Sequence, residues 1–136
     1  MRIHLSALAL TTAGAITIMA AEKPPAEHVK LMKDTNTTAT ALRGHVQAKD
    51  YDAIAGDAAA LKGFFADIEK FWTARKVDDA IGFAKAGAKG AGDLETAAKA
   101  KNEEGVAAAG RAVNGTCQGC HTAHRERLPD GTSEIK

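Results

Sequence analysis

Residues 102–127 read NEEGVAAAGRAVNGTCQGCHTAHRER, and this stretch predicts an amphipathic helix that ends in a reactive motif. Asn102 is a good N-cap residue, and Glu103 and Glu104 stand in the first turn, where the helix dipole favours negative charge. Small or apolar residues then recur at helical spacing: Val106, Ala109, Val113 and Cys117. We expect the helix to run to about residue 127, with Leu128-Pro129-Asp130-Gly131 ending it and a frayed tail of five residues behind.

Upstream of this helix, three further segments have helical chemistry. No proline occurs between Pro25 and Pro129, and alanine, lysine, glutamate and leucine dominate. The predicted helices cover residues 26–48, 52–71 and 76–100. Asp50 or Asp52 is the expected N-cap of the second, and the boundary with the third falls within residues 70–77. Short links between the helices predict an all-α fold, an antiparallel up-down-up-down four-helix bundle.

The N-terminus has the features of a secretory signal peptide. A basic start at Arg2 is followed by an apolar run from Leu5 to Met19 and then by small residues. We therefore predict a signal peptide over residues 1–21 and one mature domain over residues 22–136. The apolar run is short for a bilayer span, so a retained anchor is the weaker alternative and no membrane span is expected after signal removal.

The predicted mature chain is electrically balanced. Of the 18 basic residues only Arg2 lies in the signal peptide, which leaves 17 basic residues against 17 acidic ones. A neutral chain without a basic block argues against nucleic acid or an anionic membrane as the partner. The core has few aromatic side chains, namely 4 Phe, 1 Trp and 1 Tyr, and a large flat cofactor would add apolar volume.

The pentapeptide Cys117-Gln118-Gly119-Cys120-His121 is the C-x-x-C-H signature of covalent haem attachment. Positions i, i+3 and i+4 share one helical face, so both thiols and the imidazole point the same way. The two sulfurs can then bond one haem c while His121 binds its iron. Three alternatives are weaker: a disulfide in an exported protein, a redox dithiol, which would need a preceding strand, and zinc, which would need further ligands.

Around this motif the sequence resembles the cytochrome c′ family, the class II c-type cytochromes. In the family pattern the histidine of C-x-x-C-H is followed by two variable residues, then an aromatic residue and then an arginine. Here His124 stands in place of the aromatic residue, and Arg125 matches the arginine. Leu31-Met32-Lys33-Asp34 is similar to the first-helix segment of the low-spin subgroup, in which a methionine binds the iron. The resemblance implies haem near the C-terminal helix and His121 and Met32 as its axial ligands. Dimerisation through the first two helices is common in the family.

The position of Met32 in a bundle favours the same role. A heptad-like seam in the first helix consists of Val29, Met32, Asn36, Ala39, Arg43 and Val46. Met32 is the only methionine after the signal peptide, and an antiparallel bundle brings the start of the first helix level with the end of the fourth. A flexible core side chain is the alternative role for Met32. His28, one turn earlier, is the rival iron ligand.

Other side chains are candidates for the surroundings of the haem. Arg43, on the otherwise apolar seam, is predicted to be a buried cation that pairs with a haem propionate. Arg125, one turn after His121, is predicted to tune the hydrogen bonding of that imidazole, with a solvated arginine at the helix end as the alternative. His124 is expected near a haem edge, with a partly exposed surface histidine as the alternative, and Trp72 is expected to be a core residue.

With His121 and Met32 both bound, the iron would have no open position, which suits an electron carrier rather than an enzyme. We therefore expect a periplasmic electron-transfer protein that has a transient redox protein as its partner. The alternative is a five-coordinate haem protein that binds NO or CO. Weak peroxidase activity from such an open iron is a third hypothesis.

Overall fold

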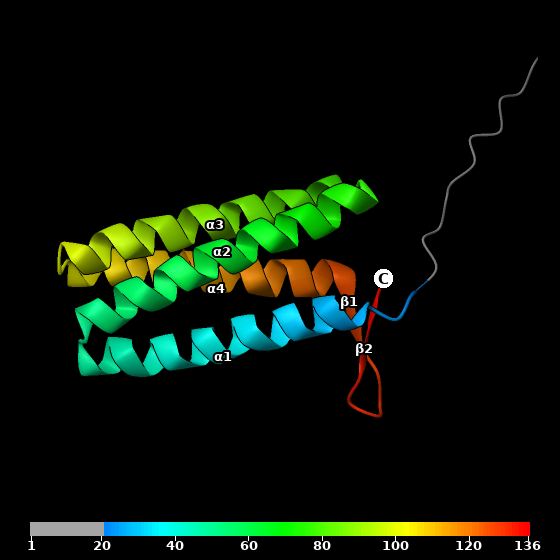
Figure 1. Ribbon diagram of the computed structural model, residues 1–136, viewed down its shortest axis with the longest axis horizontal. Coiled ribbons are helices and arrows are strands. Elements are labelled where there is room, and N and C mark those ends of the chain that lie inside the picture. Colours follow the sequence, from blue (N-terminus) through cyan, green and yellow to red (C-terminus); the bar gives the residue numbers. More distant parts are fainter. Residues whose placement is uncertain (1–20) are drawn as a thin grey trace, which may run out of the picture.

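The computed structural model describes residues 21–136, which form four helices and a short hairpin (Figure 1). The helices are α1 (Ala26–Ala48), α2 (Tyr51–Arg75), α3 (Asp78–Lys99) and α4 (Glu103–His124). Successive helices run in opposite directions, which confirms the predicted all-α, up-down-up-down bundle. The predicted signal peptide, residues 1–21, lies outside the described residues except for Ala21. None of the described helices is long and apolar enough to cross a membrane.

The helix ends follow local side-chain chemistry. The side chains of Asp50 and Asn102 cap α2 and α4, as predicted, by accepting a hydrogen bond from a backbone N–H three residues later, at 3.1 Å and 3.0 Å. α2 continues to Arg75, past the predicted end at residue 71, and stops where Lys76 adopts a left-handed conformation with φ 58°. The connection to α3 therefore falls at the very end of the predicted boundary region.

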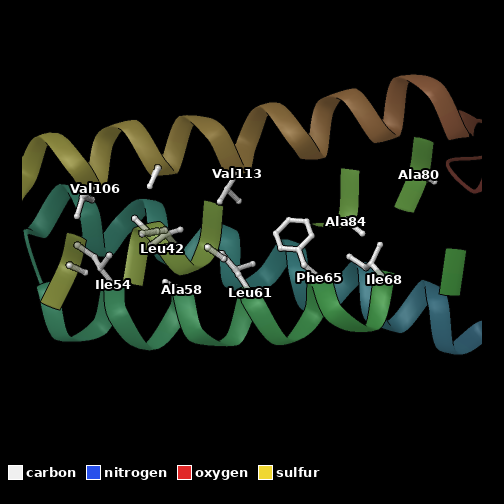
Figure 2. Packing of buried hydrophobic residues seen from close by; sticks show 14 of the residues in the cluster. Leu42, Ile54, Ala58, Leu61, Phe65, Ile68, Ala80, Ala84, Val106 and Val113 are labelled. Carbon is white, nitrogen blue, oxygen red and sulfur yellow. The ribbon is translucent and has the colours of Figure 1, made fainter. Parts of the chain in front are cut away.

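The core lies where α2 faces α3 and α4. Each pair of successive helices packs closely, whereas α1 and α4 are not among the closely packed pairs within residues 21–136. Ile54, Leu61 and Leu94 are the largest fully buried side chains. Figure 2 shows Ile54, Leu61 and Phe65 pointing from α2 toward the facing helices, and small residues of α3 such as Ala84 complete the layer. The bundle is consequently least tightly closed between its first and last helices.

Gly87 is the tightest point of this packing. A Cβ atom added at Gly87 would lie within 3.0 Å of the buried Phe65 ring, whereas one at Gly82 on the same helix would meet nothing within 4 Å. Gly87→Ala is therefore expected to lower the free energy of unfolding by about 1–3 kcal/mol through overpacking. The matched control Gly82→Ala should raise it by up to about 1 kcal/mol, because alanine is the better helix former. Urea unfolding followed by circular dichroism measures both changes, and a stabilised Gly87→Ala protein would contradict the packing argument.

The face that α1 turns to the bundle differs from the predicted seam by one residue. His28, Thr35 and Leu42 are its buried residues, seven apart, and they face α2. Val29 and Val46, from the predicted seam, are 51% and 37% exposed. The spacing of apolar residues predicts the wrong packed face, because most apolar side chains of α1 form a stripe next to the residues that contact α2.

The C-terminal residues form a hairpin instead of the predicted frayed tail. β1 (Arg125–Arg127) pairs antiparallel with β2 (Ser133–Ile135), and α4 ends at His124 rather than near residue 127. In the turn, Asp130 accepts hydrogen bonds from the N–H and the hydroxyl of Thr132 at 2.9 Å and 2.7 Å. These bonds hold the pKa of the Asp130 carboxyl below its usual value.

The hairpin is joined to the beginning of the described chain. Ile135 is buried, and its backbone exchanges two hydrogen bonds with Glu22, at 2.9 Å and 2.8 Å. The Glu22 carboxylate also accepts from the Arg75 guanidinium at 2.6 Å. The start of α1, the end of α2, the end of α4 and the hairpin therefore gather at one end of the bundle (Figure 1).

Candidate functional site

A pocket of about 540 Å³ opens at this end of the bundle. Its walls come from the first half of α1, from α2, from the last turns of α4 and from the hairpin, residues 131–135. A volume of this size accommodates a drug-sized or cofactor-sized ligand. The pocket lies between α1 and α4, the two helices that do not pack closely against each other in the described part of the chain. Residues that were singled out from the sequence line it: His28, Met32, Cys120, His121, His124 and Arg125.

The exposed stripe of α1 faces this pocket. Val29, Met32 and Asn36, which belong to the predicted seam, all line it. α1 therefore carries two functional faces, because its packed residues contact α2 while the neighbouring stripe lines the pocket.

The cysteine motif occupies the end of α4. Cys120 and His121 line the pocket, and Cys117 is half-buried against the core. Gly119 lets α3 approach this turn, since a Cβ at that position would lie 2.7 Å from the Phe83 ring. Burial raises the pKa of the Cys117 thiol, and burial together with Cys117 and Asp79 raises the pKa of Cys120 to about 11. Both thiols are thus uncharged at neutral pH, and they are not joined to each other.

His28 is a buried, neutral imidazole beside Met32. The residue is 8% exposed, and its ring stacks on Phe71 with centroids 3.7 Å apart. Burial, the Arg75 charge and His121 lower the pKa of His28 to about 4, so the ring stays uncharged at neutral pH. Met32, one turn later, is half-buried. A thioether and a neutral imidazole therefore both belong to the wall that α1 contributes to the pocket.

Two buried polar atoms of the pocket have no partner in the described protein. His28 Nδ1 and Trp72 Nε1 are fully covered and make no hydrogen bond within residues 21–136. Buried polar groups are normally paired. A bound group that combines apolar surface with polar or metal-binding atoms would fit this lining. Trp72, expected only as a core residue, is 3% exposed and is also part of this wall.

His124 and Arg125 stand where α4 ends and β1 begins. His124 lines the pocket, but its Nε2 is hydrogen-bonded to the Asp79 carboxylate at 2.9 Å, and its ring lies 5.1 Å from Trp72. Arg125 is exposed and close enough to His121 to act on its charge. The pKa of His121 is lowered first by burial and then by the positive charge of Arg125.

Arg43 does not belong to the site. The expected buried cation is exposed, and its guanidinium donates to the Thr40 hydroxyl at 3.0 Å. It lies eleven residues after Met32, about 16 Å farther along the helix, where the residues of the stripe no longer line the pocket. Lys23, which the sequence did not single out, supplies positive charge to the pocket wall.

The burial of His28 predicts a loss of stability in acid. The unfolded chain takes up a proton as the pH falls through the ordinary value of 6.5, whereas the folded chain resists protonation until about pH 4. The stability that the neutral His28 contributes to the folded state is therefore fully present above pH 6.5. It is lost as the pH falls from 6.5 to about 4. We expect this loss to be on the order of 3 kcal/mol. Urea unfolding across this range measures it; His28→Leu should flatten the profile, and an unchanged slope in that variant would contradict the assignment.

No protein-family model matches the chain, and no curated protein matches it. The fold and the pocket define the class: a four-helix-bundle protein with a pocket of cofactor size between its first and last helices.

Proposed function

We propose that this chain is a periplasmic electron-transfer protein with one covalent haem c, similar to the low-spin members of the cytochrome c′ family. Cys117 and Cys120 would hold the haem, and His121 and Met32 would bind its iron. The observation that carries the proposal is one pocket that gathers Cys120 and His121 of α4 with Met32 of α1. An imidazole and a thioether are the iron ligands of cytochromes c, and the Cys120 thiol lines the same largely apolar pocket.

The state of the two thiols argues against a redox dithiol. A reactive cysteine has a lowered pKa, whereas burial raises the pKa of both Cys117 and Cys120. The motif is also preceded by a long helix rather than by a strand. Zinc is a poor alternative because it takes four protein ligands in structural sites. Within residues 21–136 no group of three His, Cys, Asp or Glu side chains could hold a metal ion.

Each wall of the pocket has a role in this proposal. Val29, Ile135 and the methylenes of Met32 exclude water from the site. Lys23 offers positive charge to a haem propionate, in place of Arg43, which is exposed and does not line the pocket. Bound haem would supply a one-electron iron couple. Two protein ligands that stay in place in both oxidation states leave no position for a substrate, which favours an electron carrier over an enzyme.

The optical spectrum of the oxidised, purified holoprotein tests the proposal. A weak far-red band from methionine bound to ferric iron, and indifference of the reduced protein to CO, are expected. A high-spin spectrum with rapid CO uptake would overturn the axial role of Met32. Export is tested by recovering the protein from the periplasmic fraction with its N-terminus near residue 22.

A gas-binding haem protein is the second candidate. It is favoured by the 540 Å³ pocket, which leaves Met32 only half-buried. In that case Met32 would lie near an open iron position that takes NO or CO. The same CO experiment separates the two candidates.

A further inference from the structure

A second hollow lies on the outer side of the end of α4. It measures about 450 Å³ and is lined by Gln118, His121, Thr122, Arg125 and Arg127. Gln118, His121 and Thr122 stand at i, i+3 and i+4, so they share one face of the end of α4, and Arg125 follows as the first residue of β1. Arg125 and Arg127 are two residues apart in β1, which puts both side chains on one face of the hairpin. We call this hollow the arginine cleft.

The arginine cleft concentrates positive charge on a balanced chain. Neither Arg125 nor Arg127 belongs to any ion pair found within residues 21–136. The intervening Glu126 lies on the opposite face of the hairpin, paired in register with Glu134. By contrast, Arg75, at the same end of the bundle, is neutralised by Glu22. The two cations of the cleft are therefore available to a negatively charged group from outside.

His121 separates this cleft from the pocket. It is the one residue of the cysteine motif that lines both hollows, and Arg125 also borders both. The imidazole that would bind the iron is thus reached from outside through a cleft lined by arginine. Any group that docks there can contact the proposed metal ligand itself.

The geometry points to the arginine cleft as the docking site for the acidic surface of a redox partner protein. This inference rests on the proposed function. One electron would pass between the iron held by His121 and a one-electron centre of the partner, with no bond formed or broken. Paired arginines bind carboxylates in fork geometry and steer an oppositely charged partner toward the site. Electron exchange would then occur on the His121 side of the haem.

Small redox reagents of opposite charge test the electron-exchange part. The reduced holoprotein is mixed in a stopped flow with anionic ferricyanide and, separately, with cationic tris-phenanthroline cobalt(III). Arg127→Gln should slow the ferricyanide reaction about 3- to 10-fold at low ionic strength and lose this effect near 1 M salt, where the Debye length is about 3 Å. The cobalt reaction should not be slowed. Arg127 is chosen because it lines the cleft but not the pocket.

Arg111→Gln is the matched control. Arg111 is exposed on α4, ten residues before His121 and about 15 Å away along the helix, and the variant changes the net charge by the same amount. Its ferricyanide rate should stay close to that of the wild type. Equal slowing in Arg111→Gln and Arg127→Gln would attribute the effect to net charge and overturn the docking site.

Binding of an acidic peptide is a readout that does not depend on electron transfer. Hexaglutamate should shift the Nε–H signal of Arg127 in the NMR spectrum, and this signal is identified because Arg127→Gln lacks it. Hexaglutamate should also slow the ferricyanide reaction. If inorganic phosphate, added at the same total concentration of negative charge, also shifts the Arg127 signal and slows the ferricyanide reaction, the cleft binds small anions and the protein-docking proposal is wrong. A protein that lacks haem but still binds hexaglutamate would refute the electron-carrier function while leaving the cleft as an acidic-peptide site.

Discussion

Replacing both Cys117 and Cys120 by serine is expected to abolish covalent attachment of haem completely. The wild-type mature chain, produced in cells with a haem-attachment system, should have the mass of the polypeptide plus one haem. The double variant should have the mass of the polypeptide alone, because these are the only two cysteines of the chain. Any haem that His121 and Met32 still hold should be extracted by acidified butanone. Mass spectrometry of the denatured proteins, before and after extraction, measures the difference.

Gln118→Ala is the control for this experiment. Gln118 is an exposed residue between the two cysteines, so its replacement keeps the C-x-x-C-H spacing and should leave attachment unchanged. The main rival, a Cys117–Cys120 disulfide, makes a different prediction for the wild type. Its mass would be that of the polypeptide less two hydrogens, and reduction would restore them. That result would refute the haem proposal at its first step.

The signals that predict the four helices are local, which explains why the bundle follows from the sequence. Asp50 and Asn102 provide caps through side chains that reach only three residues ahead. No proline interrupts residues 26–128. The hairpin carries a weaker signal, because Pro129-Asp130-Gly131 is a turn pattern but the strands on either side have only three residues each. Its pairing with Glu22 joins the two ends of the described chain and has no local signature.

The site itself is only partly predictable from sequence. The order of antiparallel helices suffices to bring Met32 to the height of His121, and both line one pocket. The misassigned Arg43 shows the limit. A periodic pattern locates a stripe on a helix but does not tell whether a neighbour, a pocket or solvent covers each part of it. Likewise, the unpaired Nε1 of Trp72 arises from tertiary contacts that no spacing reveals.

Met32→Leu is expected to convert the haem from low-spin to high-spin and to open the iron to CO. Leucine fills nearly the same volume, so the free energy of unfolding should change by less than about 1.5 kcal/mol, apart from the lost iron bond. The thioether is removed, and with it the far-red band of the oxidised protein. The midpoint potential should fall by on the order of 0.1 V, since a methionine ligand raises it. Optical spectra, CO titration and potentiometry of the two proteins measure these changes.

Leu31→Ala separates ligation from packing. Leu31 is the neighbour of Met32 and packs against the same core, so its truncation should cost stability while the spectrum stays low-spin. A Met32→Leu protein with an unchanged low-spin spectrum would reduce Met32 to a core residue. His28 would then be the remaining candidate on α1, because its imidazole is neutral and lines the pocket. In that case His28→Leu, rather than Met32→Leu, would produce the high-spin, CO-binding form.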